Sequence, residues 1–211
     1  TAEELPRNRV AVRLDINEGD VAAIRHINIV GNQAFDDEEL LELFELQESD
    51  WWNSLTSKDK YARERLSGDL ETLRSHYLDR GYLDFNIESS QVSISPDKRD
   101  VFVAVSVSEG NEYTISDISL RGELIVPEEE LRELIELEPG DTLSQSALTA
   151  TSERLSRRLG REGYTFANVN AVPESDSEDT AAVTFFVEPG NRTYVRRINF
   201  VGNVTTKDEV P

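Results

Sequence analysis

The chain has 211 residues, with 42 acidic against 22 basic side chains and a formal net charge of -20 at pH 7. A field of this sign repels nucleic acid and anionic lipid headgroups, so we expect neither as a direct ligand, and a well-solvated acidic surface is a simpler interpretation than a cation site. The absence of cysteine excludes disulfides, thiolate zinc sites and cysteine catalysis, and the absence of methionine, start residue included, indicates a piece of a longer protein.

The first predicted elements are strands. Alternation from Val10 to Ile16 predicts a half-buried strand that ends at the Glu18-Gly19 turn and has no domain of its own. A second strand is predicted over 24–30, before the turn pair Gly31-Asn32. The acidic run 36–39 then opens a short helix, because negative side chains favour the positive end of a helix dipole.

A long helix, a glycine and an extended segment follow. The helix carries an apolar stripe, and Gly81 ends it, because glycine readily takes the left-handed conformation that caps helices. The pattern then changes to a two-residue period up to Ile94, and a turn at 96–98 leads to a strand of alternating valines over 101–107. The stripe of the helix consists of Leu66, Leu70, Leu73 and Tyr77.

The same order of elements recurs further along the chain. A strand is predicted over 115–120, a helix after Pro127, a second helix with its stripe at Leu148, Leu155 and Leu159, and strands from Val169 and over 183–187. Glycines at 31, 122 and 202 are spaced by 91 and 80 residues, and those at 19, 110 and 190 have the same spacings. Two sets of landmarks therefore indicate an array of repeats.

The repeat predicts an α+β fold. Each complete unit has the order β-α-α-β-β, with a three-stranded mixed sheet covered on one face by two helices. We expect residues 1–20 to contain the last strand or strands of a preceding unit, 21–110 and 111–190 to be complete units, and 191–211 to hold the first strand of a following unit.

No pattern in the chain indicates catalysis, so we expect a non-enzyme without catalytic, cofactor-binding or metal-binding residues. The two histidines, His26 and His76, lie 50 residues apart and are expected on the polar surface. No phosphate-binding glycine loop occurs. The acidic segment 174–179 lacks the spacing of a calcium-binding loop, so a solvated hairpin is expected there.

One strand shows a change of parity that points to a binding surface. Phe85 and Ile87 have odd numbers whereas Val92 and Ile94 have even ones, so one extra residue is needed. We expect a bulge within 89–91, although a strand that ends near Ser89 and restarts fits as well. At a sheet edge this strand could pair with an extended partner segment, so the candidate residues are Asp84, Phe85, Asn86, Ile87, Glu88, Ser89, Ser90, Gln91, Val92, Ser93 and Ile94. Its counterpart in the second unit is expected to stop at Pro173 and to pair less well.

The adjacent tryptophans Trp51 and Trp52 lie in a predicted loop. They are possible partner contacts, but a plug over the end of the helix pair is the favoured interpretation, because adjacent loop side chains usually place one inward.

Several segments resemble a known family. The first unit, through INIVGN at 27–32, WWN at 51–53, GDLETLRSHYLDRGY at 68–82 and PDK at 96–98, resembles the third POTRA domain of the BamA family of outer-membrane protein assembly factors. The second unit, through LGREGY at 159–164 and PGNRTYVRRINFVGN at 189–203, is similar to the fourth domain running into the fifth. The start of the chain resembles the end of the second domain.

The resemblance implies a periplasmic arm joined to an outer-membrane β-barrel that this chain lacks. In that family the arm receives unfolded outer-membrane proteins and docks accessory lipoproteins without consuming nucleotide. A BamB-like lipoprotein docks at the third domain, whose second strand is the pairing edge and corresponds to 84–94 here; other assembly lipoproteins use parts that are mostly absent. Alternatives are a passive spacer and the POTRA arm of a secretion porin or cell-division protein.

Overall fold

The computed structural model describes residues 2–5, 9–12, 23–48 and 63–194. Its contacts divide the chain into two compact units, one of Thr1–His76 with Asp84–Glu109 and the other of Tyr77–Leu83 with Gly110–Pro211. Near the start, β1 (Ala2–Leu5) and β2 (Arg9–Val12) form an antiparallel pair. The strand predicted over 10–16 is therefore described only to Val12, and the strand expected within 191–211 lies outside the described residues after position 194.

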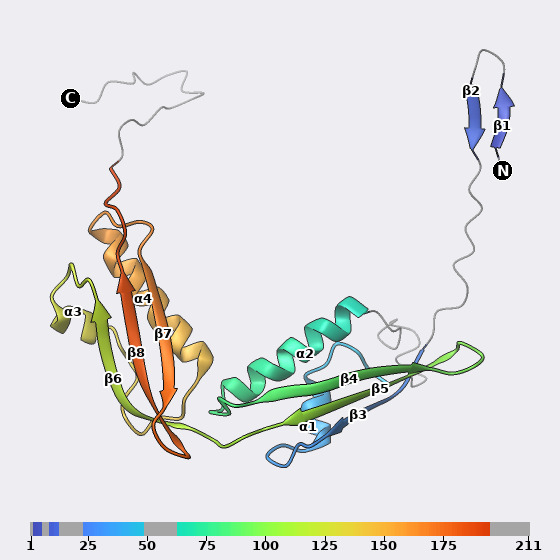
Figure 1. The fold of residues 1–211 in the computed structure, drawn as a ribbon, viewed down its shortest axis with the longest axis horizontal. Helices are drawn as coiled ribbons and strands as arrows, with labels where there is room; N and C mark the ends of the chain where they lie inside the picture. The colour runs from blue at the N-terminus through green and yellow to red at the C-terminus, as the bar shows by residue number, and fades with distance from the viewer. Residues whose placement is uncertain (1, 6–8, 13–22, 49–62, 195–211) are drawn as a thin grey trace, which may run out of the picture. The chain divides into compact units, whose positions relative to one another are not determined.

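The first unit has a mixed sheet of three strands. Its strands are β3 (Ala23–Val30), β4 (Asn86–Ile94) and β5 (Asp100–Ser108), and their order is β3-β5-β4. The central β5 runs parallel to β3 and antiparallel to β4, as Figure 1 shows. The predicted α+β class and mixed three-stranded sheet are confirmed.

The core of the first unit lies between this sheet and two helices, α1 (Asp37–Glu42) and α2 (Arg63–Leu78). Alternate side chains of β5 are buried because successive residues of a strand point to opposite faces. The predicted stripe of α2 is also buried, except for Leu70, which is only half-buried. The buried residues that these elements contribute to the first unit are Leu40, Leu66, Leu73, Val101, Val103, Val105 and Val107.

A buried carboxylate holds the segment after α1 against α2. Asp69 is only 2 % exposed, and it accepts the backbone N–H groups of Glu45 (2.7 Å) and Leu46 (3.1 Å). Burial raises the pKa of Asp69 above its ordinary value, while these two hydrogen bonds oppose the shift. Asp69 thus satisfies backbone donors that no regular helix or strand would pair.

The second unit repeats this arrangement. It contains β6 (Thr114–Gly122), α3 (Glu128–Arg132), α4 (Gln145–Arg161), β7 (Asn168–Ser175) and β8 (Thr180–Glu188), with strand order β6-β8-β7. Its core includes the predicted stripe of α4 and the alternating side chains of β8: Leu148, Leu155, Leu159, Ala181, Val183, Phe185 and Val187.

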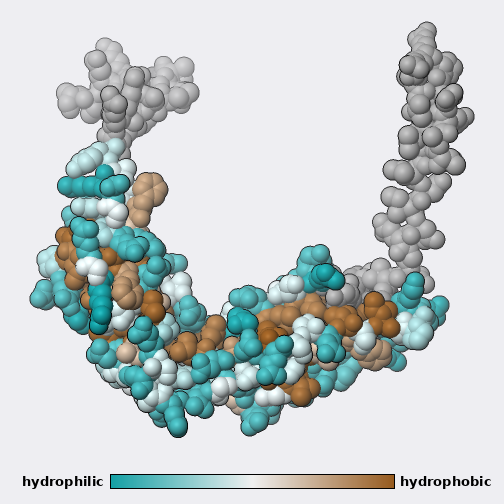
Figure 2. Space-filling model, in the orientation of Figure 1, coloured by the Kyte–Doolittle hydropathy of each residue, from teal (hydrophilic) through white to brown (hydrophobic). Residues whose placement is uncertain are grey.

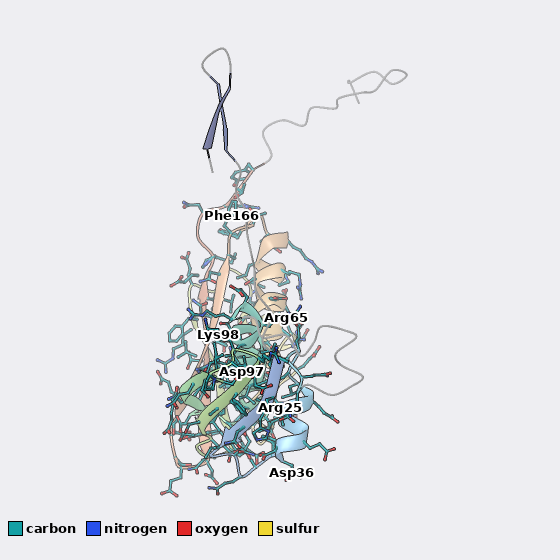
Figure 3. All side chains as sticks on the ribbon, turned by 90° about the vertical axis from the view of Figure 1, so that its right-hand side faces the viewer. Arg25, Asp36, Arg65, Asp97, Lys98 and Phe166 are labelled. Carbon is teal, nitrogen blue, oxygen red and sulfur yellow. The ribbon has the colours of Figure 1, made fainter. Side chains whose placement is uncertain are left out.

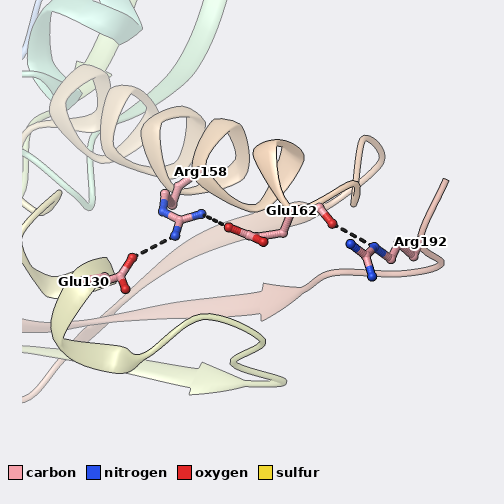
Figure 4. A network of polar contacts seen from close by, with 4 residues as sticks. All are labelled: Glu130, Arg158, Glu162 and Arg192. Carbon is pink, nitrogen blue, oxygen red and sulfur yellow. Dashed lines mark hydrogen bonds and ion pairs between the residues drawn. The ribbon is translucent and has the colours of Figure 1, made fainter. Parts of the chain in front are cut away.

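Polar contacts join the two helices of the second unit. Figure 4 shows Arg158 of α4 bonded to Glu130 of α3 (2.7 Å) and to Glu162 (2.8 Å). Hydrogen bonds to these two carboxylates raise the pKa of Arg158 above its ordinary value, and the bond to Glu162 has the larger effect. The Glu162 carbonyl also accepts the Nε–H of Arg192 at 2.9 Å, so the segment after β8 is held to the end of α4.

Two glycines show how closely the units repeat. Gly31 follows β3 and Gly122 is the last residue of β6, and their φ angles of 103° and 108° lie in a region that glycine enters without steric cost. A Cβ would lie 2.1 Å from the Val107 carbonyl oxygen at Gly31, and 2.2 Å from that of Val187 at Gly122. Each glycine therefore allows the same close approach between chain segments.

Candidate strand-pairing edge

Strand β4 forms one edge of the first sheet, because it pairs with β5 on one side and is last in the strand order. The Ser95 N–H donates to the Asp100 carbonyl at 2.9 Å. Hydrogen-bonded pairs alternate along an antiparallel ladder, so the backbone groups of Ser90, Val92 and Ile94 point away from β5. These positions could bond to an added strand without disturbing the ladder.

The predicted bulge exists, but its predicted position within 89–91 is wrong. The register of β4 against β5 shifts between Ile87 and Ser89, which makes Glu88 the extra residue. Its carboxylate accepts the Ser106 hydroxyl at 3.3 Å. Polar residues fill 88–91, so no apolar side chain marked where the parity changed.

The candidate residues differ in their accessibility. Asp84 and Phe85 precede the strand, which begins at Asn86, and the Phe85 side chain is buried. Val92 and Ile94 lie opposite Val103 and Val101, on the face that bears the core, yet they are 36 % and 57 % exposed. Figure 2 shows apolar surface along this unit. An added strand would therefore find apolar side chains beside its path on one face.

A tight turn after β4 holds the end of this edge. Asp97 accepts the Ser95 hydroxyl at 2.6 Å and the Arg99 N–H at 3.3 Å, and Lys98 takes a φ of 61°. Figure 3 labels the Asp97 and Lys98 side chains. Both hydrogen bonds lower the pKa of Asp97 below its ordinary value, and the bond from the Ser95 hydroxyl has the larger effect. The turn thereby keeps β4 in register with β5.

At the opposite edge of the first sheet, a side chain occupies the backbone N–H of Ile27. Glu48 Oε1 accepts the Ile27 N–H of β3 at 3.1 Å and lies 2.7 Å from Nδ1 of His26. His26 is exposed as predicted, whereas the surface prediction for His76 is wrong. His76 is buried one residue before Tyr77, with its ring edge-on to Phe35 at 4.8 Å and Nε2 3.6 Å from Glu39.

Both edges of the second sheet differ from β4. The segment before α4 lies along β6: Ile115 N–H donates to the Asp141 carbonyl at 2.8 Å, and Gly140 N–H donates to the Ile115 carbonyl at 2.7 Å. The prediction that the other edge strand stops at Pro173 is wrong, because β7 continues through Pro173 to Ser175. Proline is tolerated in an edge strand where its missing N–H would face outward.

Other site types find no support in the described residues. Within 23–48 and 63–194 no group of three or more acidic or histidine side chains could hold a metal ion. No helix in that part of the chain is long and apolar enough to cross a bilayer. Trp51 and Trp52 lie outside the described residues, so their predicted role as a plug or partner contact stays a prediction.

Comparisons with known proteins agree with the repeat. The POTRA family model, described as a surface antigen variable number repeat, matches residues 22–110 and 113–190. The chain is 36% identical over 205 residues to the outer membrane protein assembly factor BamA of Buchnera aphidicola, and 31% identical over 209 residues to that of Neisseria meningitidis. These matches cover 96% and 98% of this chain but only 33% and 26% of the relatives, so the chain spans about a third of their length or less.

A solved structure supports the same assignment. The crystal structure of POTRA domains 3–5 of Haemophilus influenzae BamA is 29% identical to this chain, with a TM-score of 0.75. The match covers 93% of this chain and 77% of the other. The predicted resemblance to BamA POTRA domains is confirmed.

Proposed function

Because this chain belongs to the POTRA family, we propose that its two complete units, 21–110 and 111–190, are part of a scaffold arm that serves outer-membrane protein assembly. The matched relatives are assembly factors by name, and the match extends over nearly all of this chain. The arm would lie in the periplasm and reach the outer membrane through a C-terminal barrel outside this chain. It would act by binding, without catalysis.

The observation that carries the binding role is the open edge at β4. An extended segment would bond to the outward-pointing backbone groups of Ser90, Val92 and Ile94 and become a fourth strand of the sheet. The exposed side chains of Val92 and Ile94 would contact its apolar side. Two kinds of partner supply such segments: unfolded outer-membrane proteins with alternating sequences, and a BamB-like accessory lipoprotein. The segment 84–94 would be their shared contact.

Amide chemical-shift mapping tests this proposal. A peptide of about ten residues with the alternation of a barrel strand should shift the amides of 86–94 in a saturable way. The Ile27 amide of β3 serves as an internal control, since its N–H is already bonded to Glu48. Weak shifts spread evenly over both units would contradict pairing at β4.

A variant separates a binding arm from a passive spacer. Ser90→Pro removes an outward N–H and leaves the β4–β5 ladder intact. In cells that carry the full-length protein, the binding role predicts slower assembly of barrel proteins at unchanged levels of the variant. Undiminished assembly would favour the spacer.

A further inference from the structure

The antiparallel hairpins β4–β5 and β7–β8 match pair by pair. Val92 lies opposite Val103 in the first unit, and Pro173 lies opposite Val183 in the second. The valines at 103 and 183 are both buried in the central strand of their sheet, 80 residues apart as the repeat requires. Apart from the bulge at Glu88, β4 therefore pairs with β5 in the same register as β7 pairs with β8. Pro173 occupies the position in β7 that Val92 holds in β4.

Pro173 replaces a donor that would face an incoming strand. The Asp176 N–H donates to the Thr180 carbonyl at 3.1 Å, which makes these residues a hydrogen-bonded pair. Alternation then directs Glu174 toward β8 and Pro173 outward. Proline has no N–H, so β7 lacks a hydrogen-bond donor in the middle of its outer edge.

The other edge of this sheet is already occupied by the chain itself. Beyond the bonds between Ile115 and the segment 140–141, the Leu143 N–H donates to the Tyr113 carbonyl at 2.9 Å. Thr142 also forms a bridge with Thr114. An incoming strand would have to displace this segment in order to pair with β6. At β7 no such displacement is needed, and Pro173 alone removes the donor that pairing would use.

We infer that Pro173 is a specificity-determining residue that prevents extended segments from pairing with the second unit. The segments concerned are those with free backbone groups and alternating apolar side chains. Replacing Pro173 by a residue with an N–H opens β7 to them. This inference goes beyond the proposed function, because it concerns the second unit and holds whether or not β4 binds.

The test compares two alanine variants in the whole chain. Pro173→Ala restores the outward N–H, whereas Glu174→Ala places the same side chain at the next position, where the N–H already faces β8. Each isotope-labelled variant is titrated with a peptide of about ten residues that alternates valine and threonine. We expect saturable shifts of the amides of 169–173 in Pro173→Ala, with affinity at β7 at least roughly tenfold above wild type and Glu174→Ala.

Pro173→Val is the second variant, because its β-branched side chain suits a strand and it repeats the Val92 position. Unchanged β7 shifts in both Pro173 variants, with the rest of the spectrum as in wild type, would overturn the inference. Equal binding at β7 in Glu174→Ala would also overturn it. In the same spectra, the amides of 86–94 show whether the peptide pairs with β4, which is the proposed function. If those amides do not shift, the shifts of the β7 amides still decide the inference about Pro173.

Discussion

Glu48 and Ile27 are joined by a hydrogen bond of 3.1 Å between the carboxylate and the backbone N–H, across 21 residues of sequence. Ile27 belongs to β3, the edge strand opposite β4. The carboxylate therefore takes the place that a carbonyl of an added strand would occupy. With this donor satisfied, the two edges of the first sheet differ in their capacity to pair.

Glu48→Ala should expose the Ile27 amide. Its hydrogen exchange should become faster by roughly tenfold, because the lost bond to a charged acceptor contributes about 1.4 kcal/mol. Glu48→Gln is the matched control, since its side-chain oxygen can still accept the N–H and should leave exchange within about threefold of wild type. Equal rates in wild type and Glu48→Ala would show that the carboxylate does not close this edge.

Asp69→Asn should destabilise the first unit at pH 7 by about 1–3 kcal/mol. An amide has one acceptor oxygen, so the Glu45 and Leu46 N–H groups cannot both keep a partner as good as a carboxylate. Urea unfolding, followed by the amide signals of α1 and α2, measures the difference. The substitutions Thr72→Ser and Ser75→Ala, both at exposed positions of α2, should each change stability by less than about 0.5 kcal/mol.

The difference in folding stability between wild type and Asp69→Asn should also depend on pH. Burial raises the pKa of Asp69 in the folded state above its ordinary value of 3.8. The stability that this group contributes is therefore complete below pH 3.8 and decreases as the pH rises through the folded pKa. Asn cannot titrate, so the advantage of wild type over Asp69→Asn should narrow as the pH rises from 3.8. A gap that widens would show that the two hydrogen bonds outweigh burial.

Gly122→Ala should destabilise the second unit by about 2 kcal/mol or more. Its φ of 108° is unfavourable for alanine, and the added Cβ would lie 2.2 Å from the Val187 carbonyl oxygen. Gly160→Ala is the matched control within α4, where a Cβ meets no atom within 4 Å, and should stabilise by about 0.5–1 kcal/mol. Thermal unfolding of both variants measures the two effects, and equal melting temperatures would contradict them.

The strands and helices of the repeat were predictable because their patterns are local. The alternating valines of β5 and the spaced leucines of α4 each fit one period only, and Gly31 and Gly122 mark the same turn in both units. In α2, two polar residues outside the predicted stripe, Asp69 and His76, are also buried, and the sequence pattern did not separate them from the surface. Their burial depends on partners elsewhere in the chain, such as Glu45 and Phe35.

The edges of the sheets were harder to predict. The position of the bulge at Glu88 depends on pairing with β5, and the polar side chains at 88–91 hide it. Glu48 closes β3 through a contact that no local pattern reveals. Proline was interpreted as the end of a strand, although an edge strand accommodates it where the missing N–H faces outward, as at Pro173 in β7.

The affinity of a barrel-strand peptide for Val92→Pro, compared with Val92→Thr and wild type, tests the central claim most directly. Both substitutions change the same half-exposed side chain, but only proline removes the N–H that points away from β5. Pairing at β4 predicts that Val92→Thr binds within about threefold of wild type and that Val92→Pro binds at least roughly tenfold more weakly, with the β5 amide signals retained in both. Equal affinity of all three proteins would contradict pairing at this edge.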